Sequence, residues 1–150
     1  MLLEKKNEKN ILVFVILILN LSLYAQKIAQ LNSVKIKEEN IYIVEDKLDI
    51  LKSKKDAEVY IEKAFAYLLQ DGSDFFYDIL IKKKQYSVQL FTYNEGTKNI
   101  VYLNFFIIDE KDDYLNTKEL IVFDGGTNFW NIKYDIQNDN FYDIFINGES

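Results

Sequence analysis

The chain contains no cysteine, no histidine, no arginine and no proline among its 150 residues. Without cysteine it has no disulfide, no thiol nucleophile and no thiolate metal site. Without histidine it has no imidazole base, no Ser-His-Asp triad and no histidine-bound zinc or haem. Without arginine it lacks the planar fork that binds phosphate or carboxylate at two points. Carboxylates, lysine, tyrosine, serine and threonine remain for chemistry, and we expect no cofactor and no metal.

The composition of the chain indicates a folded protein. Hydrophobic residues make up 49% of the chain and aromatic residues 15%. A chain this apolar can bury enough surface to offset the conformational entropy lost on folding. Its length fits one domain, and its formal net charge of −6 would repel a phosphate backbone. We therefore expect one folded domain and no nucleic-acid partner.

Residues 1–25 have the pattern of a secretory signal peptide. Lys5, Lys6 and Lys9 make a basic start, and Ile11–Leu19 is an unbroken apolar run. A small residue, Ala25, follows at the exit of the segment. We therefore predict cleavage after Ala25 and export of the mature chain to the periplasm or the medium.

The alternative is that the same segment stays in place as a membrane anchor. Ile11–Ala25 includes the polar residues Asn20 and Ser22, and it is shorter than the roughly 20 apolar residues that a spanning helix needs. This comparison favours a cleaved signal and a mature form without a stable membrane span.

Residues 26–150 are expected to form one α+β domain that begins with a loose polar tether, residues 26–40. Within the tether, Val34–Lys37 alternates as a short strand would, and Ile41–Val44 after it is a better strand candidate.

The clearest helix is Ser53–Gly72. Ser53 is a suitable N-cap, and Asp56 stands at the third helical position, where a carboxylate meets free backbone N–H groups. Gly72 supplies a left-handed stop. The apolar residues recur with the 3.6-residue period of one helix face, namely Ala57, Ile61, Ala64, Phe65 and Leu68.

The C-terminal half is patterned as strands separated by short polar turns. The candidate strands are Phe76–Lys82, Tyr86–Tyr93, Asn99–Ile108, Lys118–Phe123, Phe129–Ile136 and Asn140–Ile146. Short connections join neighbouring strands in antiparallel order, so a meander is predicted. Asn99–Ile108 is apolar on both of its sides, and we expect it at the centre of the sheet, covered on both faces.

One helix cannot cover both faces of such a sheet. The second face could be closed by sheet curvature, by residues 27–50 or by a partner subunit. A large patch left uncovered would be an interaction surface. We therefore expect the function of the protein on the sheet face opposite the helix.

Aromatic residues of the strands are the candidate ligand-binding set, because they could form a platform for a sugar or an apolar ligand. The candidates that we rank first are Tyr102, Phe106, Tyr77, Phe129 and Tyr142. Tyr86 and Tyr93 belong to the same wider set. The alternative is that these rings are the cross-strand pairs of an ordinary core.

Three polar clusters are weaker candidates. The acidic segment Asp109–Asp113 has the oxygen ligands that calcium prefers but not the spacing of an EF-hand loop, and a solvated loop is the alternative. Asp124–Thr127 either offers a carboxylate and free N–H groups or is a tight turn that needs positive φ. Lys82–Lys84 either meets an anion or is a charged turn that protects a sheet edge.

The order of one long helix followed by a curved antiparallel sheet resembles that of the cystatin-like and nuclear-transport-factor-like superfolds, over residues 53–147. Those folds include binding modules, dimerisation domains and some enzymes, so the resemblance implies a fold and not a function.

The leading hypothesis is a small exported, non-catalytic protein that binds through the sheet face opposite the helix. Its partner would be a protein, a second copy of the chain, or a small apolar or sugar ligand. The competing hypothesis is a small enzyme that uses carboxylates, or tyrosine and lysine, in a pocket of the concave sheet face. Such an enzyme requires at least two polar side chains that converge in a pocket.

Overall fold

The computed structural model describes residues 2–109 and 112–148. It divides the chain into two compact units, Met1–Val34 and Lys35–Ser150. We describe each unit by itself.

The first unit is one helix, α1 (Leu2–Ser33). Residues 26–33 therefore continue the helix and are not the irregular tether that the sequence predicts. Within α1, Val13–Leu31 is long and apolar enough to cross a membrane by length and composition alone, a test that a signal sequence near the N-terminus also passes. The length argument against an anchor, which counted only residues 11–25, is weakened by this continuation.

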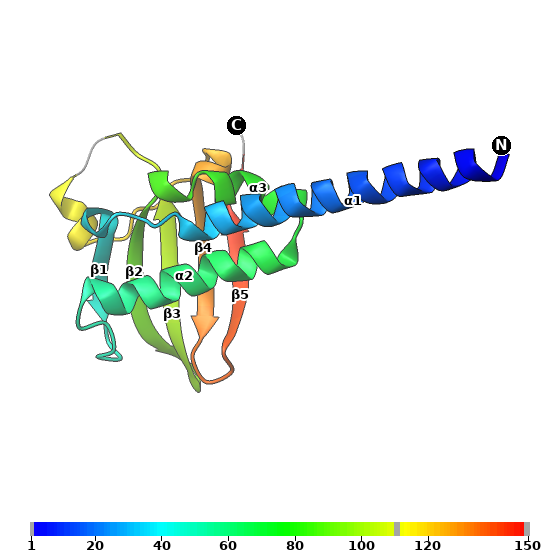
Figure 1. Cartoon of the computed structure of the whole chain (residues 1–150). Helices are drawn as coiled ribbons and strands as arrows, with labels where there is room; N and C mark the ends of the chain where they lie inside the picture. Colours follow the sequence, from blue (N-terminus) through cyan, green and yellow to red (C-terminus); the bar gives the residue numbers. More distant parts are fainter. Residues whose placement is uncertain (1, 110–111, 149–150) are drawn as a thin grey trace. The chain divides into compact units, whose positions relative to one another are not determined.

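The second unit is an α+β arrangement of a mixed five-stranded sheet and two α-helices (Figure 1). The helices are α2 (Lys54–Asp71) and α3 (Asp74–Ile81). The strands are β1 (Ile41–Asp46), β2 (Ser87–Glu95), β3 (Lys98–Phe106), β4 (Phe129–Asp135) and β5 (Asn140–Ile146). The described residues of this unit also form short 3-10 helices, namely η1 (Glu38–Asn40) before β1, η2 (Lys83–Gln85) before β2, and η3 (Asp113–Asn116) and η4 (Gly126–Asn128) between β3 and β4.

The sheet order is β1-β2-β3-β4-β5, which confirms β3 as the central strand. The strands β2 to β5 pair antiparallel, and the short connections predict this for β2–β3 and β4–β5. The direct pairing of β3 with β4 was not predicted, because residues 118–123 were expected to form a strand between them. The strand β1 pairs parallel to β2, so the prediction of a fully antiparallel meander is wrong at this edge. The chain between β1 and β2 contains both α-helices, and a connection of that length permits a parallel crossover.

Helix α2 lies across one face of the sheet, as Figure 1 shows. Its capping signals are confirmed, because the Ser53 hydroxyl accepts a hydrogen bond from the Asp56 amide and Gly72 has a left-handed φ of 67°. The five residues of the predicted apolar face are all buried. Burial of the apolar face that the sequence pattern predicted therefore holds the helix against the sheet.

Phe76–Lys82 is not a strand, because these residues form most of α3 and its C-cap. Phe76, Ile79 and Leu80 are buried, and their spacing of three and four residues is that of a helix face. A short apolar run does not distinguish a strand from a helix by its pattern alone. The unit therefore has a second helix, and the prediction of one long helix is incomplete.

Lys82–Lys84 forms a turn between α3 and β2 and does not protect a sheet edge. Lys83 is only 3% exposed, and its ammonium lies 2.7 Å from the Glu62 carboxylate and 4.9 Å from the centre of the Phe65 ring. Lys82 donates to Thr127, 2.9 Å away, and joins α3 to the turn before β4. Both lysines therefore have structural partners.

The core between α2 and the sheet is aromatic. The Phe65 ring on α2 makes edge contacts with Phe105 and Trp130, at centroid distances of 5.4 and 5.7 Å. Phe105 and Trp130 stack on each other at 4.0 Å. Tyr86, one of the aromatic candidates, belongs to this core, because it is buried and its ring lies 6.3 Å from that of Phe65.

Candidate functional site: a hollow on the sheet face opposite helix α2

The second face of the sheet carries a polar row at its middle. Cross-strand pairing places Gln89 beside Asn104, and Asn104 beside Asn131, on adjacent strands. Side chains alternate between faces along a strand, so this row lies on the opposite side from Leu90, Leu103 and the aromatic core. An amide row at this position provides hydrogen-bond donors and acceptors for whatever covers the face.

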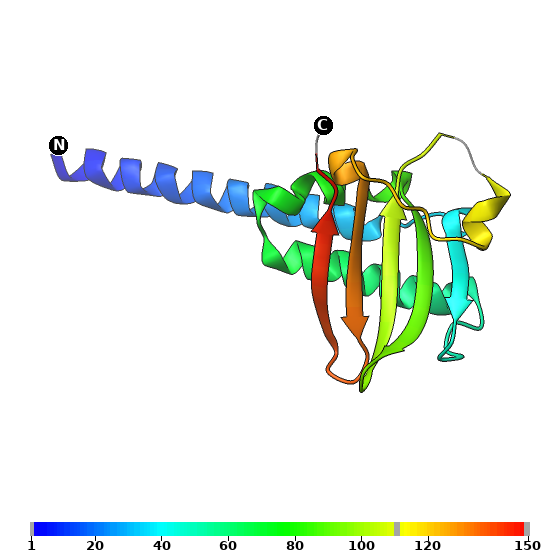
Figure 2. The same cartoon turned by 180° about the vertical axis from the view of Figure 1, so that it is seen from behind.

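What covers one end of this face is residues 112–128, which we call the cover segment. Figure 2 shows it crossing in front of the sheet, yellow to orange, on the side away from α2. At one end η3 packs on β1, and at the other Asp124 forms an isolated bridge with Gly148, just after β5. The sequence left open what covers the second face, and the structure shows that a segment of the same chain covers part of it.

Gln89 is the main anchor of the cover segment. Its side chain is fully buried, and its Nε2 donates to the carbonyls of Leu115 and Lys118 at 2.8 and 2.7 Å. Its Oε1 accepts from the Leu120 amide at 2.8 Å. Asn104 Nδ2 also donates to the Leu120 carbonyl at 2.8 Å. Two side chains of the sheet thus satisfy backbone groups that a strand would have paired with another strand.

These bonds explain why Lys118–Phe123 is not a strand. Its backbone runs beside the sheet face and bonds to side chains, so no β-ladder forms there. Asn147 adds a further contact, because its Nδ2 donates to the carbonyls of Val122 and Asp124. The prediction of a strand at Lys118–Phe123 is therefore wrong, because the backbone of this segment bonds to side chains of the sheet and not to another strand.

Apolar contacts close the same end of the cover. Tyr42, Phe106 and Leu115 form a buried cluster, with Val44, Ile108, Leu120 and Phe129 packed against it. The rings of Tyr42 and Phe106 stack with centroids 6.3 Å apart. The cover segment is therefore held by both burial and hydrogen bonds near β1 and β2.

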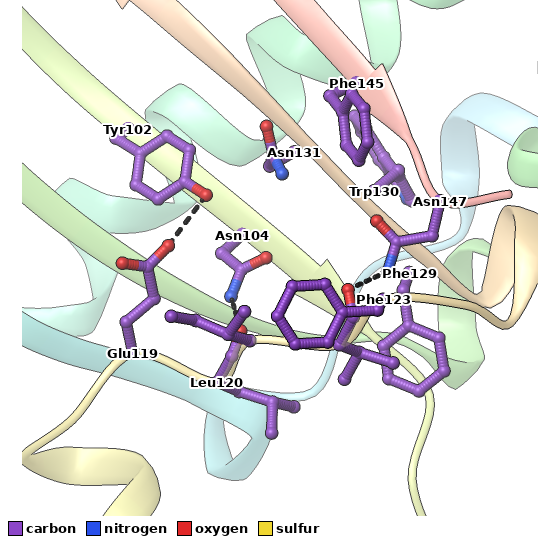
Figure 3. A pocket seen from close by; sticks show the side chains of 12 residues that line it. Tyr102, Asn104, Glu119, Leu120, Phe123, Phe129, Trp130, Asn131, Phe145 and Asn147 are labelled. Carbon is purple, nitrogen blue, oxygen red and sulfur yellow. Dashed lines mark hydrogen bonds between the residues drawn. The ribbon is translucent and has the colours of Figure 1, made fainter.

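Beyond the cluster, the cover segment and the sheet enclose an open hollow of about 310 Å³, which we call the apolar hollow. Figure 3 shows its side chains arranged around this space. The residues that line it are Tyr102, Asn104, Glu119, Leu120, Ile121, Val122, Phe123, Phe129, Trp130, Asn131, Phe145 and Asn147. Its volume is at the lower end of the range found for small-molecule sites.

Large apolar side chains at the mouth of this hollow are exposed to water. Phe123 is 92% exposed, Ile121 66% and Phe145 59%. A single exposed apolar residue is ordinary, but three that line one hollow form a patch that a bound molecule would cover.

A second open hollow, of about 460 Å³, adjoins the first, and we call it the aromatic hollow. Tyr102, Glu119 and Asn131 line both hollows. The remaining residues of the aromatic hollow are Glu45, Phe91, Tyr93 and Lys133. The rings of Phe91 and Tyr102 contact each other with centroids 5.7 Å apart. The two hollows together follow the second face from an apolar end to a polar, aromatic end.

Charged groups at the aromatic end are paired with one another. Lys133 lies 2.8 Å from Glu95 and 3.3 Å from Asp143, and the Tyr142 hydroxyl donates to Glu95 at 2.7 Å. Hydrogen bonds from Lys133 and Tyr142 lower the pKa of Glu95. The bond to Glu95 raises the pKa of Lys133. Both groups therefore remain charged at neutral pH.

The tyrosines of this face are held neutral. Burial, followed by the charge of Glu119 and the hydrogen bond to it, raises the pKa of Tyr102. That bond runs from the Tyr102 hydroxyl to the Glu119 carboxylate at 2.9 Å (Figure 3). Burial also raises the pKa values of Tyr93 and Tyr142. Each of these hydroxyls is therefore a hydrogen-bond donor and not an available base.

The structure separates the five aromatic residues that were ranked first. Tyr102 and Phe129 line the apolar hollow. Tyr142 is in β5, bonded to Glu95 and outside the lining of both hollows. Phe106 is buried in the cluster under the cover segment. Tyr77 is in α3 because the strand predicted there is a helix. Tyr93, from the wider set, lines the aromatic hollow.

The polar clusters of the sequence do not join the hollows. Among residues 2–109 and 112–148, no group of three or more acidic side chains is placed to hold a metal ion, and Glu110 of the acidic segment lies outside the described residues. In Asp124–Thr127 the turn interpretation is confirmed, because Gly125 and Gly126 have φ values of 103° and 56°. A Cβ on Gly125 would lie 2.5 Å from the Phe129 ring, so this turn requires glycine.

Several residues of the hollows were missed because they belong to elements that the sequence assigned differently. Glu119, Leu120 and Phe123 were placed in a strand, where their side chains would have alternated between two faces. Phe145 was placed in β5 without a partner surface.

No protein-family description matches the chain, and neither the curated proteins nor the solved structures compared with it give a match.

Proposed function

We propose that this is an exported, non-catalytic binding protein that takes a small ligand with an apolar part into the apolar hollow. The observation that supports this best is the hollow itself, an open cavity of about 310 Å³ between the cover segment and the sheet. Its apolar lining and its few polar side chains match the usual composition of small-molecule sites. A ligand there would cover Phe123 and Phe145, which are otherwise in water.

The ionisable groups at the hollows favour binding over catalysis. General acid–base catalysis works best with groups whose pKa values are close to the operating pH. Here the pKa of Glu95 is lowered, and those of Lys133 and Tyr102 are raised, so each shift leads away from neutrality. The competing proposal of a carboxylate or tyrosine–lysine enzyme therefore gains no support from Glu95, Lys133 or Tyr102.

A neutral apolar dye tests the proposed function. Nile red should bind the full-length protein, and Phe145→Ala should weaken its binding roughly threefold to tenfold, because the substitution removes an apolar wall of the hollow. Val59→Ala, an exposed apolar exchange on α2, is the matched control and should leave the affinity unchanged. Dye fluorescence titrated against protein measures both affinities.

An equal affinity of wild type and Phe145→Ala for the dye would contradict the proposed function. Because α1 is apolar and present in every variant, dye bound to α1 contributes equally to all titrations and cancels in the comparison. A protein partner or a second copy on the same face is the other form of this proposal. Gel filtration showing a dimer that Phe145→Ala dissociates would favour that form over a small ligand.

We propose in addition that residues 1–25 are a signal peptide that is removed on export. The apolar helix α1 supports this proposal by its composition and position. Mass spectrometry of the protein from the periplasm or the medium should find Gln26 as its first residue. An intact α1 in the membrane fraction would identify an anchor instead.

The relation to the cystatin-like and nuclear-transport-factor-like superfolds also stays a proposal. One long helix, α2, against a strongly antiparallel sheet supports it. The parallel strand β1 and the second helix α3 are features that such a relation would have to accommodate.

A further inference from the structure

We propose that the ligand is an organic cation, with its apolar part in the apolar hollow and its positive group in the aromatic hollow, beside Tyr102 and Glu119. This inference rests on the proposed function, because it names the ligand class for the same site. It depends on how rings and charges are distributed along the second face.

The first observation is the position of Glu119. This residue of the cover segment lines both hollows, so its carboxylate stands where they meet. It accepts one hydrogen bond, from Tyr102, and no ion pair to it is present in the described part of the chain. A carboxylate with no cationic partner, beside a cavity, attracts a positive group.

The second observation is that Lys133, the one lysine among the described residues that line the aromatic hollow, is already paired with carboxylates. Lys133 contacts the carboxylates of Glu95 and Asp143 at 2.8 and 3.3 Å. Glu45, on the opposite wall, pairs with Lys47 at 3.0 Å. The surroundings of Glu119 therefore keep a net negative charge, which would repel an anionic ligand.

The third observation is the aromatic floor. Phe91, Tyr93 and Tyr102 line the same hollow as the Glu119 carboxylate, and their rings stand on the second face of adjacent strands β2 and β3. Aromatic faces attract cations, and several rings beside a carboxylate suit an alkylated ammonium group. Phe91 and Tyr93 are only partly buried, so their rings are accessible from the hollow.

The fourth observation is continuity between the two hollows. Tyr102, Glu119 and Asn131 line both, so one molecule can reach from the apolar lining to the aromatic floor. Figure 3 shows Tyr102 and Glu119 on one side of the cavity and Phe129 and Phe145 on the other. An amphipathic cation has the same order of properties along its length.

Binding of three six-carbon probes to the full-length protein tests the inference. They are hexyltrimethylammonium, neutral hexanol and anionic hexyl sulfate, each titrated while amide signals of residues 119–122 are followed by NMR. The cation should bind at least about fivefold more tightly than hexanol, and hexyl sulfate more weakly than hexanol. Signals at the cover segment separate this site from any binding to α1.

Two substitutions and one control complete the test. Glu119→Gln, which keeps the size and can still accept from Tyr102, should remove the preference for the cation and leave hexanol binding intact. Phe91→Leu should weaken cation binding more than hexanol binding. Glu58→Gln on α2, behind the sheet, makes the same change in net charge and should have no effect.

The outcomes separate the two proposals. If hexanol binds at the cover segment as tightly as the cation does, or if Glu119→Gln leaves the preference unchanged, the cation inference is wrong and the proposed function stands. If no probe shifts the signals of residues 119–122, both the inference and the small-ligand function are wrong.

Discussion

Replacing Gln89 with leucine should lower the free energy of unfolding by about 2 to 4 kcal/mol and release the cover segment from the sheet. Leucine has a similar size but cannot bond to Leu115, Lys118 or Leu120. Their backbone groups would be left without partners in a buried place, and each unpaired buried group costs about 1 to 3 kcal/mol unless the segment opens to water. Urea denaturation followed by Trp130 fluorescence measures the loss.

Gln70→Leu is the matched control for this prediction. It is the same exchange at an exposed position near the end of α2, and it should change stability by less than about 0.5 kcal/mol. If Gln89→Leu is as stable as Gln70→Leu, the amide of Gln89 does not hold the cover segment. The open form of Gln89→Leu should also lose the binding of Nile red, because the apolar hollow needs both of its walls.

Phe65→Ala should destabilise the protein by about 3 to 5 kcal/mol. The Phe65 ring contacts Phe105, Trp130 and Tyr86, and it also stands beside the buried ammonium of Lys83. Alanine would leave a cavity under α2 and remove the ring face from that ammonium. Thermal unfolding and urea denaturation should both report the loss.

Phe123→Ala provides the contrast, since the same exchange is made at a residue that is 92% exposed. It should change the stability by less than about 0.5 kcal/mol while weakening the binding of Nile red. A stability loss in Phe123→Ala as large as that in Phe65→Ala would contradict the assignment of the core to the α2 side of the sheet.

The elements that could be predicted from the sequence are those whose own pattern decides their structure. Helix α2 has a cap, a periodic face and a glycine stop, and all three are found in the structure. The hairpins β2–β3 and β4–β5 are joined by short turns, and both pair as predicted. The central place of β3 followed from its two apolar sides.

The elements that were mispredicted depend on tertiary contacts. The run Phe76–Lys82 is apolar enough for either a strand or a helix, and packing of α3 against α2 decides the outcome. The segment Lys118–Phe123 is apolar enough for a strand, but its backbone bonds to the side chains of Gln89, Asn104 and Asn147. Hydrogen bonds between a backbone segment and side chains that are distant in the sequence cannot be predicted from a local pattern.

The candidate site was likewise predicted only in the part that depends on local sequence patterns. The choice of the second sheet face came from the shortage of helix to cover it, and Tyr102 and Phe129 were among the residues named for it. Glu119 and Phe145 could not be identified, because their meeting requires the cover segment to cross from β1 to the end of β5. Amide side chains at Gln89 and Asn104, each directly between apolar neighbours in its strand, were the available signal for a covered face.

The most direct test of this structure is hydrogen exchange of the Leu120 backbone amide in the full-length protein. If the cover segment lies on the sheet, this amide donates to the buried Gln89 side chain, and it should exchange at least about 100-fold more slowly than in an unfolded chain. Exchange of the Leu120 amide at the rate of an unfolded chain would show that residues 112–128 do not cover the sheet, and that no hollow forms there.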